Sequence, residues 1–138
     1  MRILLAVDGS KPSLKAVQLL IDHADWYAER PRVELVTVHL PVPKVGHTNK
    51  AQLERYYQEE GEAMLAPAKK KLDAAGVAYQ ARVLVGAVAE AIVRHAKDTR
   101  CDLIYIGTRG MSEIGKALVG STATKVLHIS DTPVLLVK

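Results

Sequence analysis

Glycines, a hydroxyl and an arginine between residues 107 and 122 are the side chains best suited to hold an anionic ligand. Gly107, Gly110 and Gly120 lie between an apolar run, 103–106, and a stretch with helical character, 122–128. Glycine lets a backbone approach a phosphate closely, and the amides of a helix's first turn point at such a group. The spacing therefore predicts a phosphate-binding loop between a buried strand and a helix. A glycine-rich surface loop that binds nothing explains these residues equally well.

Part of this segment imitates a Walker A loop. Residues 110–117 read Gly-Met-Ser-Glu-Ile-Gly-Lys-Ala, but Ala117 stands where a P-loop needs the Ser or Thr that ligates Mg²⁺. Gly110 also lies several residues beyond the predicted strand end at Ile106, whereas a P-loop begins directly after its strand. We therefore reject this interpretation. Ser121 is predicted to act as helix N-cap or as a phosphate donor, with Arg109 adding charge at the rim.

Asp8 is a second candidate for ligand binding. It follows the apolar run 2–7, which predicts a central strand, and ligands gather at the carboxyl ends of strands in open α/β sheets. A helix is predicted to start after the N-cap Ser10 and to run to about Arg30. A helix-capping role is the alternative for Asp8 and, on its own, the simpler one.

The rest of the chain alternates predicted helices and strands. A candidate lid, 41–49, precedes a long helix in which we expect a kink or break near Pro67 and a C-terminal Gly76. The other expected elements are a strand at 33–40, the long helix at 50–75, an alternating strand at or near an edge at 77–85, a helix at 87–97 and a strand at 133–137.

This order of elements predicts an α/β fold. Without hairpin signals the strands should be parallel, with helices on both faces, and 138 residues suit a single domain. Right-handed crossovers favour a doubly wound five-stranded sheet of order 3-2-1-4-5. Strands one and four are then neighbours, so Asp8 and Gly107 should face one crevice.

Composition excludes several classes of function. The net charge of +4 comes without a basic stripe interleaved with aromatics, so no nucleic-acid binding is expected. The single Cys101 rules out an internal disulfide and a cysteine zinc cluster. No metal site is predicted, because the five histidines have no metal-ligand spacing and are expected to be structural or exposed. The apolar run after Arg2 is too short for a signal peptide or a membrane span, so we expect a cytoplasmic protein without a membrane partner.

The chain resembles universal stress proteins over nearly its whole length. The likeness lies in residues 3–10, 76–86, 102–110, 120–121 and 133–137. The motif Gly-x2-Gly-x9-Gly-Ser/Thr of the ATP-binding branch is complete at Gly107, Gly110, Gly120 and Ser121. The resemblance implies one domain, 1–138, with a Rossmann-like fold similar to adenine nucleotide alpha hydrolases. Thr122 departs from a common Val, and Gly86-Ala-Val replaces a Gly-Asp-Pro/Val-like turn.

The resemblance also implies a site for ATP, with or without Mg²⁺. Leu40 would flank adenine, Asp8 would lie near the ribose hydroxyls, and residues 107–112 would wrap ribose and phosphates. Gly120, Ser121 and Thr122 would donate to the phosphates. The implied site residues are Ala6, Val7, Asp8, Leu40, Gly107, Thr108, Arg109, Gly110, Met111, Ser112, Gly120, Ser121 and Thr122.

We therefore expect a dimeric, nucleotide-dependent regulator of the stress response, with an unknown regulated partner, rather than an enzyme. The sequence contains no recognisable Ser-His-Asp set, catalytic carboxylate pair or cluster of acidic residues for magnesium. The apolar strand Val134–Val137 at the sheet edge is expected to pair with its copy in a homodimer. Alternatives are an interaction protein of this fold that binds no nucleotide, a weak ATPase, and a nucleotidyl-transferring or ATP-pyrophosphatase enzyme. The last class resembles Ser-Gly-Gly-x-Asp-Ser after the first strand, whereas this chain has Val7-Asp-Gly-Ser10.

Overall fold

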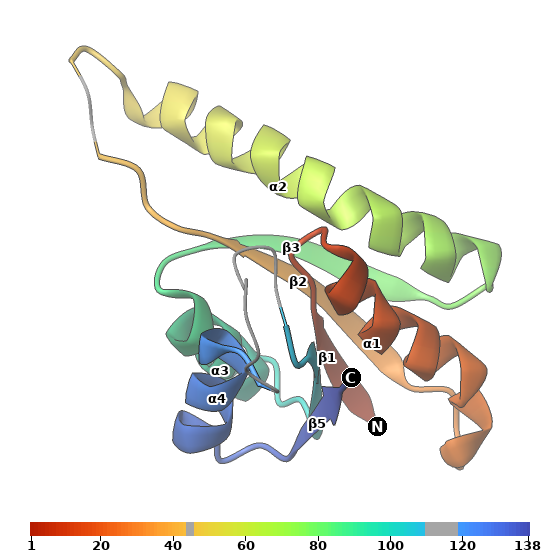
Figure 1. The fold of residues 1–138 in the computed structure, drawn as a ribbon. Helices are drawn as coiled ribbons and strands as arrows, with labels where there is room; N and C mark the ends of the chain where they lie inside the picture. The colour runs from red at the N-terminus through yellow and green to blue at the C-terminus, as the bar shows by residue number, and fades with distance from the viewer. Residues whose placement is uncertain (44–45, 110–118) are drawn as a thin grey trace.

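Five parallel strands form one sheet in the computed structural model, which describes residues 1–43, 46–109 and 119–138. Their order is β3-β2-β1-β4-β5, which confirms the predicted topology (Figure 1). In the centre of the sheet Leu4 pairs with Glu34 on one side and with Ile104 on the other. The strands are β1 (Arg2–Ala6), β2 (Arg32–His39), β3 (Tyr79–Val85), β4 (Leu103–Gly107) and β5 (Val134–Val137).

Helices cover both faces of this sheet and divide the core in two (Figure 1). One core lies beneath α1 (Lys11–Asp22) and α2 (Lys50–Ala74), the other beneath α3 (Val88–Asp98) and α4 (Ser121–Ile129). Alternate residues of β1, β2, β4 and β5 enter opposite cores, as strands buried on both faces require, whereas the edge strand β3 is half-exposed. No helix of the described residues is long and apolar enough to cross a membrane.

Helix α1 is shorter than predicted. Ser10 is its N-cap, accepting a hydrogen bond from the Ser13 amide at 3.3 Å, but the helix ends at Asp22 and not near Arg30. A 3₁₀ turn, η1 (Ala24–Trp26), follows. The turn brings Tyr27 to the buried Tyr105, and their hydroxyls hydrogen-bond. The end of α1 is thus set by a contact between residues distant in sequence, and not by a glycine or a proline.

Helix α2 is continuous through Pro67, which excludes the break, one of the two alternatives predicted there. Proline removes one backbone hydrogen bond from a helix interior, but burial of an apolar stripe on both sides of it holds the helix on the sheet. That stripe comprises Gly61, Leu65, Ala68 and Leu72. The helix ends as predicted at Gly76, whose positive φ of 66° allows the Val77 amide to reach the Leu72 carbonyl at 3.0 Å.

Candidate functional site

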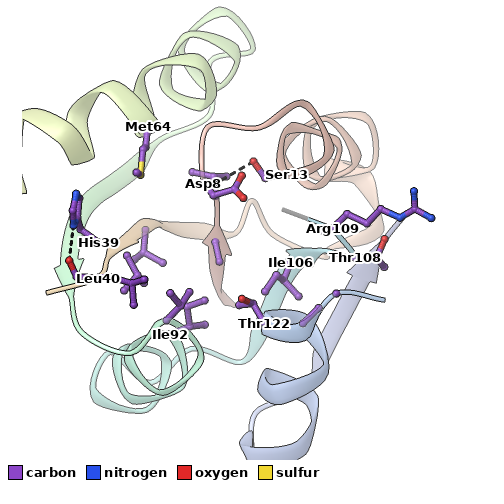
Figure 2. A pocket seen from close by; sticks show the side chains of 18 residues that line it. Asp8, Ser13, His39, Leu40, Met64, Ile92, Ile106, Thr108, Arg109 and Thr122 are labelled. Carbon is purple, nitrogen blue, oxygen red and sulfur yellow. Dashed lines mark hydrogen bonds between the residues drawn. The ribbon is translucent and has the colours of Figure 1, made fainter. Parts of the chain in front are cut away.

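A cavity of about 400 Å³ opens where β1, β2 and β4 end (Figure 2). Nine of the thirteen predicted site residues line it: Ala6, Val7, Asp8, Leu40, Gly107, Thr108, Arg109, Gly120 and Thr122. Asp8 and Gly107 face one crevice, as the strand order predicts. Ser121 is exposed and lies instead in a shallow groove on the outside of α4. Gly110, Met111 and Ser112 lie outside the described residues.

Asp8 is held at the middle of the cavity by the turn that leads into α1. Its Oδ1 accepts hydrogen bonds from the amide and the hydroxyl of Ser10, at 2.9 and 2.5 Å. Its own amide donates to Ser13 Oγ at 3.4 Å (Figure 2). The two interpretations of Asp8 are therefore compatible, because the carboxylate braces this turn and also lines the cavity.

The end of the cavity beside β2 is apolar. Val36 and Val38 come from β2, and Leu40, with 60% of its surface exposed, follows the strand. Met64 of α2 and Ile92 of α3 face them from opposite sides of the sheet (Figure 2). This slot lies between two helices and has few polar groups, so it suits a flat aromatic ring.

The opposite end of the cavity, beside β4, lies at the first turn of α4. Helix α4 begins at N-cap Gly120, which has no side chain to cap the helix, so the prediction of Ser121 as N-cap is wrong. First-turn amides have no intrahelical acceptor, and Thr122 and Ala123 of that turn line the cavity. Their partial positive charge, with Arg109 at the rim, suits an anion.

The resemblance implies that Gly120 donates to the phosphates, but in the structure its amide already has a backbone acceptor. It donates to the Thr108 carbonyl at 2.6 Å, while the Thr108 amide donates to the Val137 carbonyl at 2.9 Å. These bonds fix the end of β4 against the start of α4 and the end of β5. The Gly120 amide is thereby committed to the backbone and does not face a ligand.

Gly107 has a packing role of its own. A Cβ at this position would lie 3.1 Å from the Pro12 carbonyl oxygen and 3.3 Å from the Ser13 Cα. Glycine therefore allows the first turn of α1 to approach β4 closely, which brings the Asp8 turn to the crevice.

The profile of the universal stress protein family matches residues 1–138. The chain belongs to this family. Among curated universal stress proteins, one of Thermus aquaticus is 34% identical over 99% of this chain and 97% of its own length. Slr1230 of Synechocystis is 34% identical over 97% of this chain, which spans only 41% of that relative's length.

One solved structure similar to this chain is that of a universal stress protein with a bound ligand. It is 28% identical, covers 100% of this chain and 97% of its own, and has a TM-score of 0.75. That protein was crystallised in complex with cAMP.

Several cavity residues of this universal stress protein escaped sequence reasoning. Val36 and Val38 carry a usable signal, because they alternate with the residues of the other core along the strand that leads to Leu40. Met64 and Ile92 carry none, since only the packing of their helices brings them to the cavity. Across the described part of the chain, no group of three His, Cys, Asp or Glu side chains could hold a metal ion.

Proposed function

We propose that the cavity binds ATP, with or without Mg²⁺, across the ends of three neighbouring strands. The observation that carries this proposal is the order of chemistries along the sheet edge: an apolar slot at β2, the Asp8 carboxylate at β1 and helix amides at β4. Strands lie about 4.8 Å apart, so this order covers about 10 Å. A nucleotide presents base, ribose and phosphates in the same order.

Each part of the nucleotide then meets suitable groups. The base lies among Val36, Val38 and Leu40, and Asp8 accepts from a ribose hydroxyl. The phosphates lie at the first turn of α4, where amides and the helix dipole stabilise negative charge.

cAMP is a second candidate ligand, because the 28% identical relative was crystallised with it. A cyclic nucleotide uses the base slot but brings a single phosphate and a ribose with only its 2′-hydroxyl free. Competition between ATP and cAMP in calorimetry ranks the two ligands. No heat with either, or with ADP or AMP, would refute the site and leave the interaction protein that binds no nucleotide.

A charge placed at the phosphate end tests the pose directly. Thr122→Glu puts a carboxylate on the cavity side of α4, while Thr124→Glu puts the same charge on the exposed outer side of the same helix start. An acidic residue near a helix N-terminus is favourable, so both variants should fold. Like charges about 4 Å apart repel by about 1 kcal/mol in bulk water and about 4 kcal/mol near a protein surface, so Thr122→Glu should weaken ATP binding about fivefold or more. Equal affinities for the two variants would contradict the pose.

We further propose that the protein hydrolyses ATP slowly and acts as a regulator. Asp8 already accepts two hydrogen bonds from Ser10 through one oxygen, which makes it a weak general base. Phosphate release by purified protein should stay well below about 1 per second, the lower end for typical enzymes. Turnover of several per second would favour the ATPase alternative.

The regulator is proposed to be a cytoplasmic homodimer that pairs through β5, the last strand at one edge of the sheet. The carbonyls of Pro133 and Val137 accept hydrogen bonds from Ile104 of β4 and from Thr108 just after it, so the alternate residues Val134 and Leu136 direct their amides outward. An unpaired apolar edge invites pairing with another strand, and a second copy supplies one.

A further inference from the structure

We propose that His39 is a specificity-determining residue, which selects adenine over purines that carry an oxygen at position 6. The inference rests on the proposed function, because it needs the base at the β2 end of the cavity. His39 is the last residue of β2 and lines the cavity beside Leu40 (Figure 2). Its carbonyl accepts from the Gly86 amide at 3.0 Å, so its backbone is fixed to the start of the loop after β3.

The hydrogen bonding of the imidazole ring determines which nitrogen can read a base. Nδ1 lies 2.7 Å from the Leu40 carbonyl oxygen (Figure 2). A carbonyl can only accept, so Nδ1 carries the proton of this bond. In the neutral ring Nε2 is then an acceptor, and it has no hydrogen-bond partner among the residues that the structure describes.

Two tyrosines of α2 hold the ring in place. The Tyr56 and Tyr57 rings meet it edge to face, with centroids 5.5 and 5.2 Å from the imidazole centroid. The Tyr57 hydroxyl also accepts from the Val42 amide at 2.9 Å, which ties the segment after β2 to α2. A ring held on several sides presents its acceptor without a large loss of side-chain freedom on binding.

A fixed acceptor distinguishes purines by the group at position 6. Adenine has an amine there, which donates, whereas hypoxanthine and guanine have an oxygen, which accepts. Nε2 can bond to the amine and repels the oxygen. His39 is half-buried at the rim, so one hydrogen bond of ordinary net strength should favour ATP over ITP about 3- to 10-fold.

Calorimetry with ATP and ITP tests this inference at about pH 8, the upper end of the range in which imidazoles titrate. ITP carries the same ribose and triphosphate, so the ratio of the two affinities cancels changes at those parts. His39→Phe keeps a flat ring between the tyrosines but removes the acceptor, and its ratio should fall to about 1. His39→Lys offers donors only, so its ratio should fall below 1. His128→Phe, on an exposed position of α4 outside the cavity, is the matched control and should keep the wild-type ratio.

The outcomes separate this inference from the proposed function. Wild-type protein that binds neither nucleotide refutes the proposed function itself. Wild-type protein that binds ATP, with a ratio unchanged in both His39 variants, refutes only the role of His39. If both variants fail to fold, ¹⁵N NMR of wild-type protein labelled at histidine decides. The Nε2 resonance of His39 should move on addition of ATP toward that of a hydrogen-bonded acceptor, and an unmoved resonance overturns the inference.

Discussion

Replacing Gly61 by alanine should destabilise the protein, although alanine is the better helix former. A Cβ at this position of α2 would lie 2.4 Å from both methyl carbons of Val83 on β3. Carbon atoms in contact lie about 3.5–4.0 Å apart, so the helix or the strand must shift by more than about 1 Å. Overpacking of this kind costs about 1–3 kcal/mol and helix propensity returns about 1 kcal/mol. The net loss in free energy of unfolding should be up to about 2 kcal/mol.

Urea denaturation of Ala66→Gly, of Val83→Ala and of the double variant Gly61→Ala/Val83→Ala isolates the cause. Ala66→Gly, at an exposed position of the same helix, measures the propensity term and should cost about 1 kcal/mol. Val83→Ala removes the two crowded methyls but leaves its Cβ 2.9 Å from the new one. The strain should therefore fall only in part, with a coupling of about 1 kcal/mol between Gly61→Ala and Val83→Ala. Additive losses, or a stabilising Gly61→Ala, would refute close packing as the reason for this glycine.

Three further predictions concern the ribose, the sheet edge and the thiol. Asp8→Ala should weaken ATP binding about 10- to 100-fold in calorimetry, since hydrogen bonds to charged groups contribute about 1.5–3 kcal/mol, while inorganic tripolyphosphate binds as before; equal losses for the two ligands would contradict the ribose contact. Leu136→Pro removes an outward-facing amide of β5 and should yield monomers in sedimentation, and a wild type that is monomeric at micromolar concentration would disprove the dimer. Burial raises the pKa of the Cys101 thiol, so iodoacetamide should react slowly with folded protein and faster in urea; equal rates would show that the thiol is accessible.

The sheet and the place of the site follow from local patterns in the sequence. Short apolar runs separated by helical stretches fix the parallel order, and that order alone brings Asp8 and Gly107 to one crevice. These inferences succeed because each depends on residues near in sequence and on the handedness of crossovers.

The remaining features depend on contacts between distant residues. The end of α1 is set by the hydrogen bond between Tyr27 and Tyr105, and the continuity of α2 through Pro67 by packing on the sheet. His39 gave no sequence signal as one of five scattered histidines, because Tyr56 and Tyr57 reach its ring only once α2 lies on β2.

The glycine motif by itself does not identify the ligand. Gly107 is favoured by the close approach of α1, a packing reason that needs no phosphate, and the Gly120 amide is bonded to the Thr108 carbonyl and not to a ligand. The glycine motif includes neither the apolar slot at the end of β2 nor the acid at the end of β1. These two features lie in line with the helix amides, and it is this order that points to a nucleotide. If the glycines served packing alone and the cavity bound no nucleotide, a carboxylate at position 122 would have no more effect on ATP affinity than one at position 124. The paired glutamate variants therefore test the ligand, where a glycine substitution would test only the fold.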